Sequence, residues 1–176
     1  SEDGMNIIRS EFKITNSIFS NTPYDAIDID FGEGKLINLQ FRNIGNDAID
    51  VSGTLINLED IFIYGAKDKG ISVGEKSLLK GQGVTISKSN VGIASKDSSE
   101  VYIDEANMFN NVIDFEVYQK KTEFGPASLV LEDINFEGKL GIDYILEKFS
   151  YLKINDNPYY PNVENYYQKM NSNNIN

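Results

Sequence analysis

The sequence predicts an all-β solenoid, in which short strands stack in successive coils around one core. The first observation is a repeat of about 22 residues, a length typical of solenoids. Rows starting at residues 3, 25, 47, 69 and 91 open with DGMNI, DAIDI, DAIDV, KGISV and VGIAS, and a longer row starting at residue 113 opens with IDFEV. The second observation is the type of apolar residue. The chain contains 22 Ile and 11 Leu, and β-branched side chains such as Ile favour strands. Coils with such a period bury their apolar faces only against neighbouring coils.

A short strand is expected at the start of each row. Positions three and five are apolar and share one face of the strand, which therefore points inward. These positions hold Met5/Ile7, Ile27/Ile29, Ile49/Val51, Ile71/Val73, Ile93 and Phe115/Val117. Position two is small in the five regular rows, which indicates a corner where backbone layers approach closely: Gly4, Ala26, Ala48, Gly70 and Gly92.

Later in each row, further alternating runs supply the other inward columns. They are Ile14 and Ile18; Leu36, Leu39 and Phe41; Leu58, Ile61 and Ile63; Val84 and Ile86; and Val101, Ile103, Ala106 and Met108. Rows four and five carry one extra residue, in GEKS and KDSS, and one fewer later. A slip that is confined to a turn preserves the inward register of the strands.

The turns between these runs are rich in Asn, Asp, Ser and Gly, as strand corners are. Asn16 and Asn38 fall in the same column, and Asp60 follows. Two interpretations remain open here: a ladder of side-chain hydrogen bonds along the stack, or ordinary turn propensity.

Two architectures share a period of this length, leucine-rich repeats and parallel β-helices. The Ile-rich composition and the lack of a recurrent Leu pattern favour the second. Residues 3–137 resemble the right-handed parallel β-helix family, the pectin-lyase-like superfamily, in period, corner and inward columns. The resemblance implies a right-handed parallel β-helix solenoid of about six to seven coils.

The C-terminal part departs from the repeat. Residues 142–156 are expected to form a last irregular coil, with a short helix as the alternative, so the β-helix domain spans residues 1–156. Residues 157–176 are rich in Asn and Tyr and are expected to form a cap or tail, with one helix after Asn162. Because open solenoid ends expose strand edges, the chain is expected to be a fragment whose N-terminal end is covered by further chain, another domain or a subunit.

Composition excludes several classes of function. A net charge of -11 with only two Arg, Arg9 and Arg42, argues against nucleic acid and anionic membrane surfaces. The chain has no Cys and no His, so thiolate chemistry, disulfides and the commonest zinc ligands are absent. No apolar run is long enough to span a membrane. The absence of Cys is compatible with secretion but does not require it, and a secreted or cell-surface location is expected as part of the hypothesis of an extracellular β-helix module.

The predicted outward face of the first strands carries a column of carboxylates. Asp25 and Asp47 stand at row position one, and Asp28 and Asp50 at position four. Stacked like charges repel unless a cation or hydrogen bonds compensate for them. These four residues are candidate ligands for calcium, a cation that binds several oxygen ligands. The alternative is a solvated acidic face without a metal.

The motifs in this column resemble those of polygalacturonase-type glycoside hydrolases. NTPYDAIDI, GNDAIDV, DKGISVG and VGIASK stand in the order of the family's Asn-Thr-Asp, Asp-Asp, Gly-His-Gly and Arg-Ile-Lys signatures. The resemblance implies four candidate catalytic residues: Asp25, Asp47, Lys69 and Lys96.

The chain departs from the family pattern at three places. Asn46 stands for the first Asp of the pair, Lys69 for the His, and Ala94 for the Arg. Inverting hydrolysis needs a supported acid and a base about 6.5–9.5 Å apart. The departures therefore favour a protein without catalysis.

The segment YQKKTEFG at residues 118–125 interrupts the period, and such interruptions often lie on a binding face. Tyr118, Lys120 and Lys121 are expected beside Tyr102, and together with Asp28 and Asp50 they are the candidate carbohydrate-binding residues. The other interpretation is a solvated turn with paired charges.

Three functions follow as hypotheses. The first is a non-catalytic extracellular β-helix module with a carbohydrate-binding or structural role, with polysaccharide or another glycan as its partner. The second is a polysaccharide hydrolase or lyase of the pectin-lyase-like type. The third is an adhesin-like stalk, whose outer columns would tolerate any polar residue.

Overall fold

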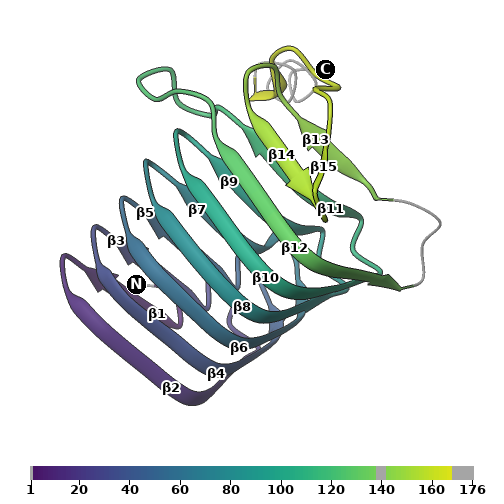
Figure 1. The fold of residues 1–176 in the computed structure, drawn as a ribbon. Coiled ribbons are helices and arrows are strands. Elements are labelled where there is room, and N and C mark those ends of the chain that lie inside the picture. Colours follow the sequence, from purple (N-terminus) through teal and green to yellow (C-terminus); the bar gives the residue numbers. More distant parts are fainter. Residues whose placement is uncertain (1, 138–141, 168–176) are drawn as a thin grey trace, which may run out of the picture.

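A computed structural model describes residues 2–137 and 142–167 as a parallel β-solenoid of stacked coils (Figure 1). Sheet A contains seven strands in the order β1-β3-β5-β7-β9-β11-β13. Their bounds are β1 Met5–Ile8, β3 Ile27–Asp30, β5 Ile49–Ser52, β7 Lys69–Gly74, β9 Val91–Lys96, β11 Ile113–Tyr118 and β13 Tyr144–Leu146. The predicted all-β repeat fold is confirmed.

Sheet B contains eight strands in the order β15-β14-β12-β10-β8-β6-β4-β2. Their bounds are β2 Glu11–Ser20, β4 Glu33–Ile44, β6 Leu55–Ala66, β8 Leu78–Ser87, β10 Glu100–Phe109, β12 Ser128–Glu137, β14 Tyr151–Ile154 and β15 Asn157–Pro158. All pairings in both sheets are parallel except that of β14 with β15.

The core lies between the two sheets and consists of the columns that the period predicts. Ile27 pairs with Ile49, and Ile49 with Ile71, so the three side chains stack directly and are fully buried. The corner at row position two is as tight as expected. A Cβ on Gly70 would lie 2.7 Å from the carbonyl oxygen of Gly92.

The long strands of sheet B bend at a residue with positive φ. Asn16, Asn38 and Asp60 have φ of 53°, 54° and 54°. Asn38 Nδ2 donates a hydrogen bond of 2.7 Å to Asn16 Oδ1, which confirms the ladder for that pair.

The bend also corrects one expected inward position. Ile18 is 66% exposed, and Ser17 instead pairs with the buried Leu39. The left-handed backbone at Asn16 interrupts the alternation of inward and outward side chains. After this bend the inward positions begin at residue 17 and not at residue 18.

Residues 142–156 form the expected irregular coil, through β13 and β14, and not a helix. The chain then returns as β15, antiparallel to β14, and Tyr159 packs against Tyr144 with ring centroids 5.1 Å apart. Of the residues after Asn162, residues 163–165 are not helical, Tyr166 and Tyr167 are helical, and any continuation of the expected helix lies outside the described residues.

Candidate functional site

Sheet A carries the expected column of polar side chains on its outward face. Asp28 lies beside Asp50, and Asp50 beside Ser72. Asn6 Nδ2 donates a hydrogen bond of 2.8 Å to Asp28 Oδ2. Burial, and then the charges of Asp30 and Asp50, raise the pKa of Asp28 to about 6. Asp28 is therefore a weaker acid than a solvated Asp side chain.

Asp25 and Asp47, the two candidate acids, connect one coil to the next. Asp25 Oδ1 accepts hydrogen bonds from the backbone N–H of Asp47 at 2.7 Å and from Asn46 Nδ2 at 2.8 Å. Asp47 Oδ1 accepts the N–H of Lys69 at 2.8 Å. Each carboxylate thus satisfies a backbone donor of the following coil, which gives row position one a structural role.

Asp47 also faces the cation that stands where the family pattern has His. Lys69 Nζ lies 3.9 Å from Asp47 Oδ1 and forms an ion pair with Asp68. Burial raises the pKa of Asp47 to about 7, and Lys69 opposes the shift only in part. Burial alone would lower the pKa of Lys69, but the charge of Asp47 and the hydrogen bond to Asp68 raise it overall.

Lys96 reaches back across the same face. Its Nζ lies 4.0 Å from Asp50 Oδ1, two strands away. Gly74 leaves room for this path, because a Cβ there would already lie 3.4 Å from Lys96 Cε. Ser72 is fully buried, and neither its Oγ nor Asp50 Oδ1 has a hydrogen-bond partner among the described residues.

The C-terminal segment covers part of sheet A. The Tyr166 hydroxyl donates a hydrogen bond of 2.6 Å to Glu116 Oε1, and its ring packs edge-on against Tyr118 with centroids 5.0 Å apart. Burial raises the pKa of Glu116. Tyr118, a candidate sugar contact, is only 4% exposed, and it lies in a different sheet from Tyr102.

The interruption after Tyr118 folds back over the corner of the preceding coil. Asp97 Oδ1 accepts the backbone N–H groups of Lys120 and Lys121, both at 2.7 Å. The Lys121 ammonium pairs with Glu75. The structure therefore ties these two lysines to a corner and does not place them beside Tyr102.

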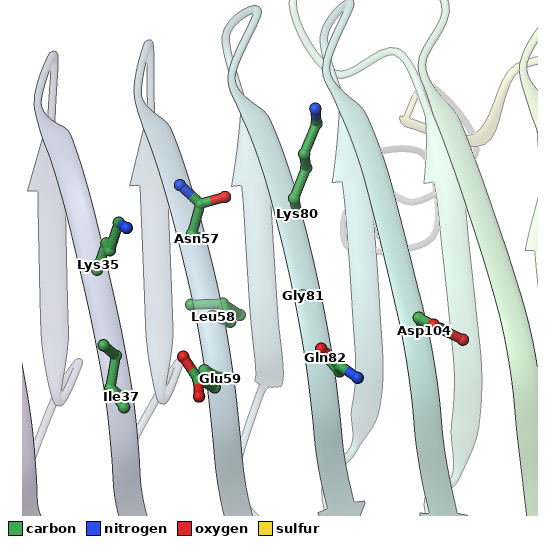
Figure 2. A pocket seen from close by; sticks show the side chains of 9 residues that line it. All are labelled: Lys35, Ile37, Asn57, Leu58, Glu59, Lys80, Gly81, Gln82 and Asp104. Carbon is green, nitrogen blue, oxygen red and sulfur yellow. The ribbon is translucent and has the colours of Figure 1, made fainter.

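A depression that sequence reasoning missed lies on the outward face of sheet B (Figure 2). It has a volume of ≈ 360 Å³ and spans β4, β6, β8 and β10. Six polar side chains line it: Lys35, Asn57, Glu59, Lys80, Gln82 and Asp104. Gly81 occupies the inward column between Leu58 and Ile103, so its missing side chain lies on the core side and gives no sequence signal for a depression on the outward face.

Tyr102 flanks this depression. It lies two residues before Asp104 on β10, so the two side chains share one face of the strand. It pairs with Lys80 on β8, is 40% exposed, and its hydroxyl donates a hydrogen bond of 3.1 Å to Glu100. An exposed ring beside a polar depression offers a stacking surface together with hydrogen-bonding groups.

The calcium hypothesis needs the column carboxylates to converge. Across residues 2–137 and 142–167, no three acidic side chains converge as metal ligands, so Asp25, Asp28, Asp47 and Asp50 are not gathered into a calcium site.

In the described part of the chain, no helix is long and apolar enough to cross a membrane.

Comparisons with models of known protein families, with curated proteins and with solved structures found no match to this chain.

Proposed function

We propose that this protein is a non-catalytic module that binds polysaccharide on the outward face of sheet B. The observation that carries the proposal is Tyr102, which lies exposed beside a polar depression that crosses four strands. Sugar rings present apolar C–H faces and polar edges, and an aromatic ring beside amide and charged groups complements both.

The location of the candidate acids favours binding over catalysis. Asp25 and Asp47 already accept backbone hydrogen bonds from the following coil. Hydrolase or lyase activity is the second candidate, and it would use Asp47 with the neighbouring Lys69. Membership of the pectin-lyase-like superfamily and a secreted or cell-surface location belong to the same proposal.

The test is affinity electrophoresis of the whole chain through gels that contain pectin, alginate, hyaluronan or dextran. Tyr102→Ala should abolish the retardation that the unchanged chain shows in at least one gel. Tyr24→Ala is the matched control, because Tyr24 is 46% exposed and lies outside the depression. If the Tyr102→Ala variant is still retarded, the polysaccharide binds at another surface and the proposed site on sheet B is wrong.

Catalysis is checked in the same samples. Release of reducing ends or unsaturated uronates, lost in Asp47→Asn, would replace the binding proposal with the enzymatic one. The third hypothesis, a stalk without a ligand, predicts no retardation in any gel.

A further inference from the structure

The charges along the depression alternate in sign from one strand to the next. Each of the four neighbouring strands contributes one charged side chain to it, in the order positive, negative, positive, negative: Lys35, Glu59, Lys80 and Asp104. The other outward residues that these strands place there, such as Asn57 and Gln82, are uncharged. Successive strands lie about 4.8 Å apart, so like charges recur about every 10 Å along the solenoid axis.

These four charges are available to a ligand. Within residues 2–137 and 142–167, none of the four side chains makes an ion pair or hydrogen bond with another side chain. Figure 2 shows the amino groups of Lys35 and Lys80 leaning toward the beginnings of their strands, while Glu59 and Asp104 lie farther along. The positive side chains and the negative side chains therefore form two parallel rows along the solenoid axis.

The spacing distinguishes between kinds of polymer. An extended peptide repeats its side chains on one face about every 6.8 Å, which does not match steps of about 4.8 Å. One pyranose unit advances a linear polysaccharide by a distance close to a single strand step. A sugar chain along the axis can thus place one ring over each strand.

We infer that the ligand is a linear polysaccharide in which carboxylate-bearing sugars alternate with amino sugars. The carboxylates lie over the β4 and β8 strands, at Lys35 and Lys80. The amino groups lie over β6 and β10, at Glu59 and Asp104, where Tyr102 also stacks on a ring. This inference rests on the proposed function. It specifies in addition the order in which charged groups follow one another along the polysaccharide.

The test compares four polymers by isothermal titration calorimetry on the whole chain at fixed salt. N-deacetylated hyaluronan alternates carboxylate and amine, polygalacturonate carries only carboxylates, chitosan only amines, and dextran no charge. The alternating polymer should bind at least about tenfold more tightly than the other three, which is the gain from one charged hydrogen bond.

A charge exchange tests the order of the charges without changing their sum. Lys35→Glu with Glu59→Lys converts the order to negative, positive, positive, negative, and should weaken binding of the alternating polymer about tenfold or more. The matched control is Lys148→Glu with Glu164→Lys, which exchanges an exposed ion pair of 3.5 Å outside the depression. The control should bind as the unchanged chain does.

The outcomes separate the inference from the proposed function. Equal binding of polygalacturonate and the alternating polymer, with binding still lost in Tyr102→Ala, would overturn the alternation and keep the carbohydrate site. Binding of no polymer would overturn both. A dimer in light scattering that the Lys35/Glu59 exchange dissociates would assign the alternating face to a second copy of the chain, and overturn the inference.

Discussion

The backbone N–H of Lys69 donates a hydrogen bond of 2.8 Å to Oδ1 of Asp47, one coil earlier in the stack. The carboxylate that makes this bond is buried, and burial raises its pKa from 3.8 to about 7. A contact that joins two coils is therefore made by a group that titrates near neutral pH.

The first prediction concerns Asp47→Asn and pH. Because the folded pKa exceeds the unfolded value, the stabilisation that Asp47 contributes is complete below about pH 4 and is lost as pH rises through about 7. Asn keeps the acceptor oxygen but does not titrate. Relative to the unchanged chain, the variant should gain about 2 kcal/mol between pH 5.5 and pH 8, since each pH unit up to the folded pKa is worth about 1.36 kcal/mol.

Urea unfolding at these two pH values measures this difference, and both lie above the pI of ≈ 4.4. Asp104→Asn, an exposed carboxylate, should show no comparable change. A gain for Asp47→Asn that is the same at both pH values would contradict the prediction.

The second prediction separates backbone strain from hydrogen bonding at Asn38. Its φ is 54°, and Gly83 occupies the same bend in a later coil. Asn38→Ala should cost about 1–2 kcal/mol, because an L side chain strains the left-handed conformation. Asn38→Gly loses the same hydrogen bond to Asn16 without the strain, and should cost less than about 1 kcal/mol. Equal losses in urea unfolding would show that the ladder, and not the backbone, matters there.

The third prediction compares two glycines on β7. A Cβ on Gly70 would lie 2.7 Å from a backbone oxygen, so Gly70→Ala should lower the unfolding free energy by about 1–3 kcal/mol. The nearest atom to a Cβ on Gly74 is 3.4 Å away and belongs to the flexible Lys96 side chain. Gly74→Ala should stay within about 0.5 kcal/mol. Thermal unfolding checks this difference: Gly70→Ala should have the lower midpoint, and a lower midpoint for Gly74→Ala would contradict the prediction.

The fourth prediction concerns the contact between Tyr166 and Glu116. Tyr166→Phe removes the hydroxyl that donates to the buried Glu116, and leaves that oxygen without this donor. Amide hydrogen exchange in residues 157–167 should accelerate about tenfold, while exchange in β5 and β7 stays unchanged. Tyr160→Phe is the control, since that side chain is 80% exposed. Acceleration throughout the solenoid would mean that the contact supports the whole stack.

The fold could be predicted because its determinants repeat in the sequence. Ile27, Ile49 and Ile71 recur at the same position of successive rows and stack in register. The extra residue in GEKS is absorbed in the corner, where Glu75 and Lys76 both have positive φ. Periodicity reports such features because every coil must meet the same packing demand.

The candidate site was harder to predict, because it depends on which sheet each strand joins. Tyr102 and Tyr118 belong to consecutive strands, β10 and β11, yet a corner between them places the first on sheet B and the second beneath Tyr166 on sheet A. The error at Ile18 has a related cause, because the φ of Asn16 cannot be read from an Asn in the sequence. The depression could not be predicted, because it depends on which outward residues of four different strands lie side by side, and the turns between the strands set that register.

The parallel pairing has a mechanical consequence. The hydrogen bonds between coils run along the solenoid axis, so tension applied along that axis loads them a few at a time and peels the stack from one end. Each detached coil would release about 22 residues of slack, on the order of 75 Å of extended chain. A stretched molecule would thus lengthen in discrete steps and dissipate mechanical work at each of them.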